Sequence, residues 1–262
     1  MTEPYYLKIK NTQEFLKHYL NIYEGAYNKR RARQIISLLP ELKNKKVLDV
    51  GCGGGFYSLA AHKKNAKLQI LMDRSAVCVK AGKLFLLKNA GVASEGVISD
   101  ASKLPFRSDY FDFILCIDLI EHVQNDIALL HELRRVLKNN GVLLVATQNS
   151  HSINYVIEAP IHRYLLKNRN WMGWDTTHLR FYNPKQLCYL MRSSNFSCIK
   201  IAGTYFIPYK LASWFKGHNK ISKIVYHVLL KFNERLEQDS EVFWNLFGWG
   251  IIYLCLKNKK IF

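Results

Sequence analysis

The stretch from Val47 to Gly55 carries the first chemical signal of this chain, because an apolar run ends there in a cluster of glycines. Lys46–Val50 is expected to be a buried strand, and the apolar spacing from Phe56 onward predicts a helix. Glycine lets the backbone turn sharply, and it lets a ligand lie against the main chain without a Cβ in the way. The free N–H groups at the start of the helix then face that ligand. The sequence therefore predicts a nucleotide-type binding turn at the carboxyl end of a strand.

The glycine spacing separates this turn from two common phosphate-binding loops. Gly51, Gly53 and Gly55 do not match the dinucleotide fingerprint, which needs its third glycine one residue later. The absence of a following Lys-Ser or Lys-Thr pair argues against a P-loop. The run Val-Leu-Asp-Val-Gly-Cys-Gly-Gly-Gly instead resembles the first motif of the class I S-adenosylmethionine-dependent methyltransferases. The resemblance implies that the methionine part of this cofactor lies against Asp49, Gly51, Cys52 and Gly53.

Acidic residues follow three further expected strands. Asp73 comes about 20 residues after the glycine turn, where a carboxylate is placed to accept hydrogen bonds from ribose hydroxyls. In the family that the chain resembles, the acidic residue at the place of Asp100 binds the exocyclic amine of adenine. Asp118 follows the next strand. Beyond the glycine turn, the expected cofactor-binding residues are therefore Asp73, Arg74, Asp100, Ala101 and Asp118.

The order of the elements predicts an α/β fold. Strands are expected over residues 46–50, 68–72, 97–99, 110–116, 142–147, 197–202 and 250–256. A helix that ends at the glycine stop Gly141 precedes the fifth strand. Alternating strands and helices imply a parallel sheet that is covered on both faces. We expect a Rossmann-like, doubly wound, seven-stranded sheet, mostly parallel, with helical and aromatic cap insertions; the resemblance implies that the last strand is antiparallel and lies at the edge.

One methyltransferase domain is expected to span residues 1–262. Helical periodicity over residues 12–39 resembles the N-terminal helices that often cover the cofactor in this family. Residues 46–150 form the expected cofactor-binding core. Residues 150–182 and 204–247 are expected to be insertions on the substrate side.

Composition indicates which binding partners and which cellular compartment to expect. The formal net charge of +18 favours anionic partners such as RNA, anionic lipid surfaces or acidic substrates, although a dispersed lysine-rich surface explains it equally well. The six cysteines lack Cys-x-x-Cys or zinc-type spacing, which favours a reducing compartment. No signal peptide is expected from the polar residues at positions 1–4, and the chain shows no apolar run of transmembrane length. A cytoplasmic protein is therefore expected, with peripheral contact to an anionic membrane surface as a further possibility.

Each insertion contains one recognisable pattern. Residues 177–187, Thr-His-Leu-Arg-Phe-Tyr-Asn-Pro-Lys-Gln-Leu, are similar to a segment of many type 11 methyltransferases in which the His and aromatic residues border the substrate pocket. The other interpretation is that His178 bridges this loop to the core. The second insertion has an apolar stripe at helical spacing from Ile221 to Leu236, flanked by basic residues. Such a stripe is typical of a helix packed on the core, and it also suits a helix on a membrane surface.

Methyl transfer to an oxygen or a protonated nitrogen requires removal of a proton. His122 and His178 are the candidate catalytic residues, because imidazole titrates near neutral pH. Asp118 and Glu121 approximate a helix capping box, but with His122 they also share one helical face that suits a metal ion. The ubiquinone-biosynthesis O-methyltransferases are similar here and use a divalent ion, yet they have Glu where this chain has Asp118. Capping is the favoured interpretation, and no metal is expected.

The predicted function is the transfer of a methyl group from S-adenosylmethionine to a small-molecule or lipid-linked acceptor, with oxygen favoured as the acceptor atom. An RNA methyltransferase of the tRNA type is the first alternative, motivated by the basic charge. A non-catalytic partner protein that retains the fold is the second. The sequence does not determine the acceptor or the oligomeric state, since fold does not fix substrate.

Overall fold

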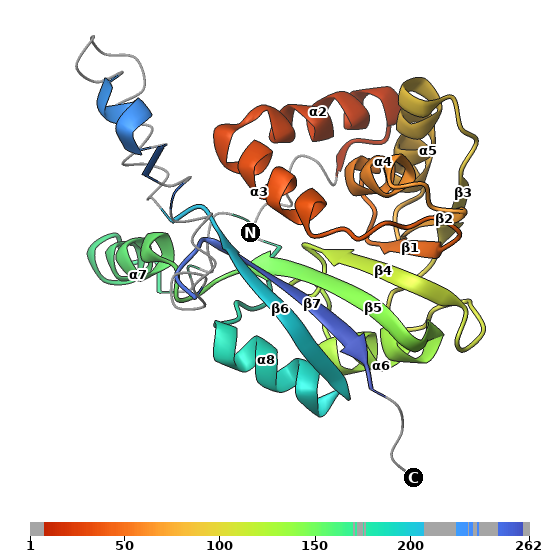
Figure 1. Cartoon of the computed structure of the whole chain (residues 1–262). Coiled ribbons are helices and arrows are strands. Elements are labelled where there is room, and N and C mark those ends of the chain that lie inside the picture. Colours follow the sequence, from red (N-terminus) through yellow and green to blue (C-terminus); the bar gives the residue numbers. More distant parts are fainter. Residues whose placement is uncertain are drawn as a thin grey trace.

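The structure is a computed structural model that describes residues 8–169, 171, 175, 177–206, 224–229, 231–232, 235 and 246–258. These residues contain a seven-stranded sheet in the order β3-β2-β1-β4-β5-β7-β6 (Figure 1). The strands are β1 (Lys46–Val50), β2 (Leu68–Asp73), β3 (Glu95–Ile98), β4 (Phe111–Ile117), β5 (Leu137–Gln148), β6 (Phe196–Thr204) and β7 (Gly250–Lys257). The first five strands pair in parallel, and β7 is antiparallel to both of its neighbours. The Rossmann-like fold predicted from the sequence is confirmed.

Helices cover both faces of the sheet (Figure 1). They are α2 (Thr12–Glu24), α3 (Ala26–Ser37), α4 (Phe56–Lys63), α5 (Ala76–Ala90), α6 (Asp126–Val136), α7 (Ile153–Pro160), α8 (Pro184–Ser193) and the π-helix η1 (Ile161–Leu165). Side chains of α6 and α8 pack with one face of the central strands, and those of α3 and α4 pack with the other. The apolar runs of the central strands are buried because both faces of the sheet are covered.

The strand register brings the carboxyl ends of the parallel strands to one edge. Val50, the last residue of β1, pairs with Met72 of β2 and with Cys116 of β4. Asp73 of β2 pairs with Ile98 of β3. The glycine turn and the acidic residues that follow β2, β3 and β4 therefore lie at the same edge, as the sequence predicted.

The predicted edge position of the last strand is wrong, because β7 lies between β5 and β6. The burial pattern explains this order. Six of the eight residues of β7 are buried, whereas β6 exposes Ser197, Ile199 and Lys200. The apolar strand takes the interior position, and a strand with exposed polar side chains takes the edge, where it tolerates solvent better.

The helix before β5 also ends earlier than predicted. Its last residue is Val136 rather than a residue next to Gly141, since Leu137 already pairs with Phe111 of β4. Gly141 lies inside β5, where a Cβ would come within 2.8 Å of the Leu137 side chain. Gly141 therefore lets the Leu137 side chain lie close to the backbone of β5, and it does not terminate the helix.

The stripe between Ile221 and Leu236 is described only in part, because both of these end residues lie outside the described residues. Residues 224–229, 231, 232 and 235 are helical, as predicted. Ile224, Val228 and Phe232 are all more than half exposed. The prediction that this stripe packs on the core is therefore wrong for these three residues.

None of the described helices combines the length and the apolar character that crossing a bilayer requires.

Candidate active site

The glycine turn between β1 and α4 has the backbone that only glycine adopts readily. Gly51, Gly53 and Gly55 have φ values of +73°, +50° and +77°, in the left-handed region. A Cβ on Gly53 would come within 2.8 Å of the Tyr19 ring of α2, and Tyr19 also packs against the next glycine. Glycine is therefore required here both by the turn and by the aromatic ring that covers it.

Asp73 forms a hydrogen bond with the turn, and Asp49 forms one with the helix that follows the turn. Asp73 accepts a hydrogen bond from the Gly53 amide at 3.2 Å and another from the Ser75 amide at 2.9 Å. Asp49 is buried within β1 and accepts a hydrogen bond from the Ser58 hydroxyl at 2.6 Å. Burial raises the pKa of Asp73 above its usual value and raises that of Asp49 to about 7. Asp73 lies beside the turn, whereas the carboxyl group of Asp49 bonds to α4.

The remaining predicted cofactor residues differ in exposure. Asp100 is exposed and accepts hydrogen bonds from the amide and hydroxyl of Ser102, which lower its pKa. Ala101 and Cys52 are buried, and Arg74 is exposed. These residues follow β1, β2 and β3 at the same edge of the sheet, so the structure places them around the turn as expected.

Asp118 at the end of β4 is held by an arginine that the sequence did not point to. The guanidinium of Arg31, on α3, donates to both carboxylate oxygens of Asp118 at 2.5 Å. Arg31 is buried, whereas the Asp118 side chain is 39% exposed. Asp118 has a φ of +51°, which is uncommon for a residue with a Cβ. This ion pair ties the N-terminal helices to the carboxyl end of the central strand.

The capping interpretation of Asp118 and Glu121 is wrong. Residues 118–125 form bends and turns, and α6 begins only at Asp126, with Asn125 as its N-cap. The metal interpretation assumed the same helix, so its geometric premise is wrong as well. The turn, closed by a hydrogen bond from the His122 amide to the Leu119 carbonyl, nevertheless brings the side chains of Glu121 and His122 near each other.

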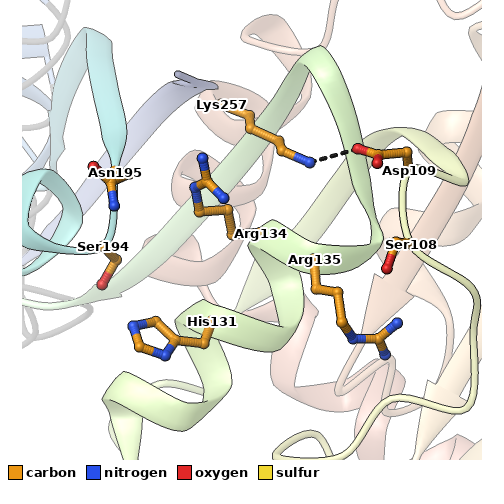
Figure 2. A pocket seen from close by; sticks show the side chains of 8 residues that line it. All are labelled: Ser108, Asp109, His131, Arg134, Arg135, Ser194, Asn195 and Lys257. Atoms are coloured by element: carbon orange, nitrogen blue, oxygen red, sulfur yellow. Dashed lines mark hydrogen bonds and ion pairs between the residues drawn. The ribbon is translucent and has the colours of Figure 1, made fainter. Parts of the chain in front are cut away.

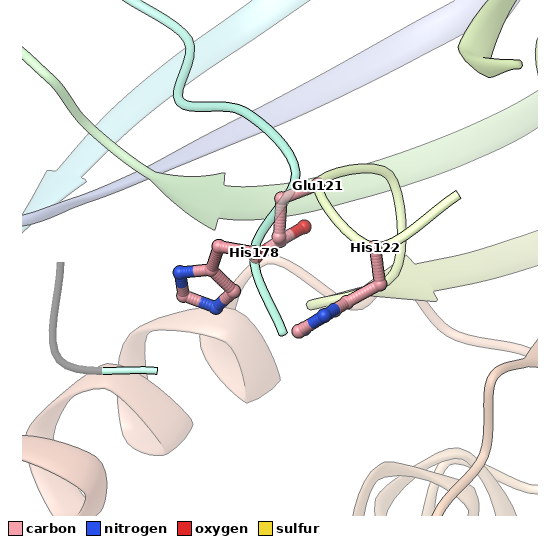
Figure 3. A group of neighbouring side chains, drawn as sticks. All are labelled: Glu121, His122 and His178. Atoms are coloured by element: carbon pink, nitrogen blue, oxygen red, sulfur yellow. The ribbon is translucent and has the colours of Figure 1, made fainter. Parts of the chain in front are cut away.

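Glu121, His122 and His178 form one cluster (Figure 3). One ligand atom from each of these residues lies within 4.8 Å of the other two. Glu121 and His178 are buried, and His122 is half-buried. Among the described residues, neither carboxylate oxygen of Glu121 nor Nδ1 of His178 has a hydrogen-bond partner. The two candidate catalytic histidines are therefore brought together, with a carboxyl group that sequence analysis had assigned to a cap.

The hydrogen bonds of His122 fix its tautomer. Its Nδ1 lies 3.3 Å from the Thr177 carbonyl, which only accepts, so Nδ1 carries the hydrogen. The same nitrogen lies 3.0 Å from the Thr177 hydroxyl, which itself donates to Asp175 at 2.6 Å. The lone pair of a neutral His122 is therefore on Nε2, where it is able to accept a proton or bind a cation.

Burial sets the protonation of the other two members of the cluster. Burial, followed by the nearby charge of Asp118, raises the pKa of Glu121 to about 8. Burial and the neighbouring His122 lower the pKa of His178 to about 4. At neutral pH Glu121 is then a neutral acid and His178 a neutral imidazole. The hydrogen bonds of His122 leave its Nε2 as the atom that is able to accept a proton.

The segment around His178 is docked on the loop that carries Glu121 and His122. The Leu179 amide donates to the Glu121 carbonyl at 2.9 Å. Arg180 forms an ion pair with Asp126 at 2.9 Å, and the Tyr182 hydroxyl donates to the same carboxylate at 2.7 Å. These contacts of Leu179, Arg180 and Tyr182 dock the loop on the core, and the His178 ring lies beside that of His122, with centroids 4.7 Å apart. Both interpretations of His178 stay predictions.

Comparison with known proteins identifies the family of this chain. A family model described as "Methyltransferase domain" matches residues 24–201. The ubiquinone biosynthesis O-methyltransferase of Pelagibacter ubique (strain HTCC1062) is 31% identical over 171 residues, which cover 63% of this chain and 67% of that protein. The enzyme of the same name from Nitrosomonas europaea is 26% identical over 181 residues, covering 69% and 76%. This chain belongs to the class I S-adenosylmethionine-dependent methyltransferases.

A solved structure supports the fold assignment of the methyltransferase independently. The solved structure is that of a Thermotoga maritima S-adenosylmethionine-dependent methyltransferase, described as a possible histamine N-methyltransferase. It superposes with a TM-score of 0.61 over 94% of this chain and 97% of its own, at 19% identity. At this identity the likeness shows the fold alone.

The cofactor of the family is S-adenosylmethionine, and the site's own chemistry fits it. The turn has the left-handed backbone that glycine adopts readily, and the Tyr19 ring of α2 lies directly against the main chain at Gly53, where a Cβ would meet that ring. The carboxylate of Asp73 lies at the edge of the sheet that carries the turn, where negative charge suits a sulfonium cation, whereas that of Asp118 is paired with Arg31. Asp73 keeps lone pairs for a ribose, since each carboxylate oxygen accepts more than one hydrogen bond.

Sequence reasoning missed the connection between the N-terminal helices and the site. Tyr19 stood out only as part of an apolar helical stripe, and Arg31 only as part of a basic cluster. No local pattern indicates that Arg31 meets Asp118, because 87 positions separate the two residues. Thr177 and Asp175, which orient His122, also come from a distant loop.

A separate cavity of about 470 Å³ lies away from this site (Figure 2). It is lined by Ser108, Asp109, His131, Arg134, Arg135, Ser194, Asn195 and Lys257. The cationic groups there are largely neutralised, since Lys257 pairs with Asp109 at 2.6 Å and Arg135 with Glu132 at 2.7 Å. The cavity includes none of the residues predicted for the cofactor or for catalysis.

Proposed function

We propose that this methyltransferase methylates a hydroxyl oxygen of a small-molecule or lipid-linked acceptor, with His122 as the general base. The observation that carries the proposal is the orientation of His122. Its Nδ1 is engaged by Thr177, which leaves Nε2 as the proton acceptor. His122 follows β4 directly, at the edge of the sheet that carries the glycine turn.

The chain's own residues perform three tasks in this reaction. Bound S-adenosylmethionine supplies a methyl group on a positively charged sulfur. The glycine turn and Asp73 hold the donor side, so the acceptor oxygen needs only to be aligned with that methyl group. His122 Nε2 would accept the proton that the acceptor hydroxyl loses when it takes up this methyl group. The positive charge on the resulting imidazolium is then stabilised by Asp175 through Thr177.

The neighbours of His122 support a site that is partly shielded from water. Glu121 and His178 are both neutral near pH 7, because burial shifts their pKa values to about 8 and about 4. A cluster without fixed positive charge does not repel the positive charge that His122 gains when it accepts a proton. The names of the relatives, which are ubiquinone biosynthesis O-methyltransferases, support oxygen as the acceptor atom and a hydrophobic acceptor.

The same cluster supports a second role, namely binding of a divalent cation. Glu121, His122 and His178 offer one oxygen and two nitrogen ligands, a set that suits zinc and several first-row transition metals. The Glu121 oxygens lack a partner among the described residues, as expected for a carboxylate that awaits one. A bound ion would deprotonate Glu121 and lower the pKa of an acceptor hydroxyl. The sequence-based expectation of no metal stays a prediction.

An activity assay with labelled S-adenosylmethionine tests both roles. The protein is incubated separately with phenolic small molecules, a lipid extract and RNA, each with and without a chelator. Label in a small-molecule or lipid product that is insensitive to the chelator supports the general-base role. Loss of that activity on chelation, with recovery on adding one divalent metal, assigns the cluster to the metal instead. Label confined to RNA contradicts the proposed acceptor class.

A further inference from the structure

Helix α7 buries polar side chains and exposes apolar ones, which is the reverse of an ordinary surface helix, and the η1 turn that follows it also exposes apolar side chains. The residues that α7 buries include Asn154 and Glu158, which are polar. The exposed side instead carries Ile153, Val156 and Ile157. An amphipathic helix in water normally does the opposite.

The apolar exposure continues through η1 and beyond it. Tyr164 is 80% exposed and Leu165 is 75% exposed, and Leu166 is also exposed. We call these exposed residues of 153–166 the α7–η1 face. Contiguous exposed apolar surface of this kind marks an interaction site rather than ordinary surface variation.

The charges around the α7–η1 face have one sign. Lys167 and Arg169 follow it directly and are both exposed. The carboxylate of this segment, Glu158, is buried. The described part of the second insertion repeats the pattern, because the helical residues Val228 and Phe232 and the helical residues Lys231 and Arg235 are all exposed.

The location of the face relates it to the site. Residues 153–166 come soon after the carboxyl end of β5, and residues 224–229, 231, 232 and 235 lie beyond the carboxyl end of β6 (Figure 1). Tyr155 of α7 packs with Phe181, whose ring packs in turn with His178 of the catalytic cluster. A surface that docks on the α7–η1 face is therefore two aromatic contacts away from His178.

We infer that the α7–η1 face docks on an anionic phospholipid bilayer. Apolar side chains enter the boundary between headgroups and acyl chains, and Lys167 and Arg169 bind the anionic headgroups. The one-signed charge favours a bilayer over a second copy of the chain, since two such faces would bring like charges together. The purpose of this docking, which is access to a lipid-linked acceptor, rests on the proposed function. The docking itself does not require methyl transfer.

Vesicle co-sedimentation tests this docking directly. The full chain is mixed with vesicles of phosphatidylglycerol and phosphatidylcholine, or of phosphatidylcholine alone. We expect sedimentation with the anionic vesicles, and a decrease as salt is raised. The double variant Tyr164→Ser, Leu165→Asp is expected to bind the anionic vesicles about tenfold more weakly or worse, because it removes two large apolar groups.

Matched variants separate this effect from a general loss of apolar surface. Tyr189→Ser, Leu87→Asp removes a tyrosine that is 76% exposed and a leucine that is 54% exposed from α8 and α5, and it is expected to sediment like the wild type. Lys167→Ala, Arg169→Ala is expected to weaken binding to anionic vesicles, whereas Lys80→Ala, Lys88→Ala on α5 is not. Binding of S-adenosylmethionine, measured by calorimetry, shows that each variant is folded.

Three results overturn the inference: a wild type that stays in the supernatant, equal losses in the α7–η1 variant and its control, or self-association that the Tyr164 and Leu165 changes abolish. The last result assigns the face to a second copy of the chain. Docking without methylation of any lipid or small molecule would instead contradict the proposed acceptor and leave the docking intact.

Discussion

Glu121 provides the sharpest test of the electrostatics of the site. In the folded protein its pKa is raised to about 8 by burial, whereas an ordinary glutamate releases its proton near pH 4.5. Between these two values the folded state binds more protons than the unfolded chain. The free energy of unfolding therefore falls as the pH rises, by about 1.4 kcal/mol per pH unit, or about 5 kcal/mol at most by pH 8.

The variant Glu121→Gln removes this titration while keeping the volume of the side chain. We expect it to unfold at higher urea concentration than the wild type at pH 8, by up to about 5 kcal/mol in free energy, and to differ little near pH 4.5. Glu132→Gln is the control of opposite sign, because the pKa of Glu132 is lowered by Arg135. That variant is expected to be less stable than the wild type at neutral pH.

Urea unfolding of both variants between pH 4.5 and pH 8 measures how their free energy of unfolding depends on pH. An unchanged pH slope in Glu121→Gln, or equal destabilisation at both ends of the range, would show that Glu121 is ionised in the folded state and has a partner. Adding a divalent cation to the wild type separates these cases further. If the cluster binds that ion, the wild-type slope is expected to flatten, since the bound carboxylate no longer holds a proton.

Three further predictions concern the residues around this cluster. His122→Asn should reduce kcat about 100-fold to 10,000-fold and leave the affinity for S-adenosylmethionine unchanged in calorimetry; a small effect on kcat refutes the base assignment. Arg31→Met should lower the free energy of unfolding by about 2 kcal/mol, less than for a fully buried ion pair because Asp118 is partly exposed; unchanged urea unfolding would contradict this. Gly53→Ala should weaken cofactor binding through its left-handed φ and the clash with Tyr19, and Tyr19→Ala should relieve part of that loss, which calorimetry of the single and double variants measures.

The core of the fold was predictable because its signals are local. The apolar run of β1 and the glycine turn identified the first strand and the start of α4. The strand ends then placed Asp73, Asp100 and Asp118 at one edge without any knowledge of side-chain contacts. The capping box of α8, formed by Asn183 and Gln186, is likewise a local signal, since the two residues are three positions apart.

Three features were not predictable from local patterns. Spacing alone does not distinguish a helical turn from the tighter turn that carries Glu121 and His122, since both place such residues near each other. An apolar stripe indicates a face that avoids water, but it does not say whether the fold provides a partner for it. Val228 and Phe232 show that the described structure does not cover this one. The ion pair between Arg31 and Asp118 depends on how the N-terminal helices pack on the sheet.

Calorimetric titration with S-adenosylmethionine tests the central claim, that the glycine turn and its neighbouring carboxylate bind this cofactor. The wild type is expected to bind it, and Asp73→Ala to lose about 100-fold or more in affinity, because charge-assisted hydrogen bonds to the ribose disappear. Asp112→Ala, a change of the same type that removes the contacts of Asp112 with Lys46 and Lys138, is expected to bind like the wild type. Equal affinity of Asp73→Ala and the wild type would contradict the account.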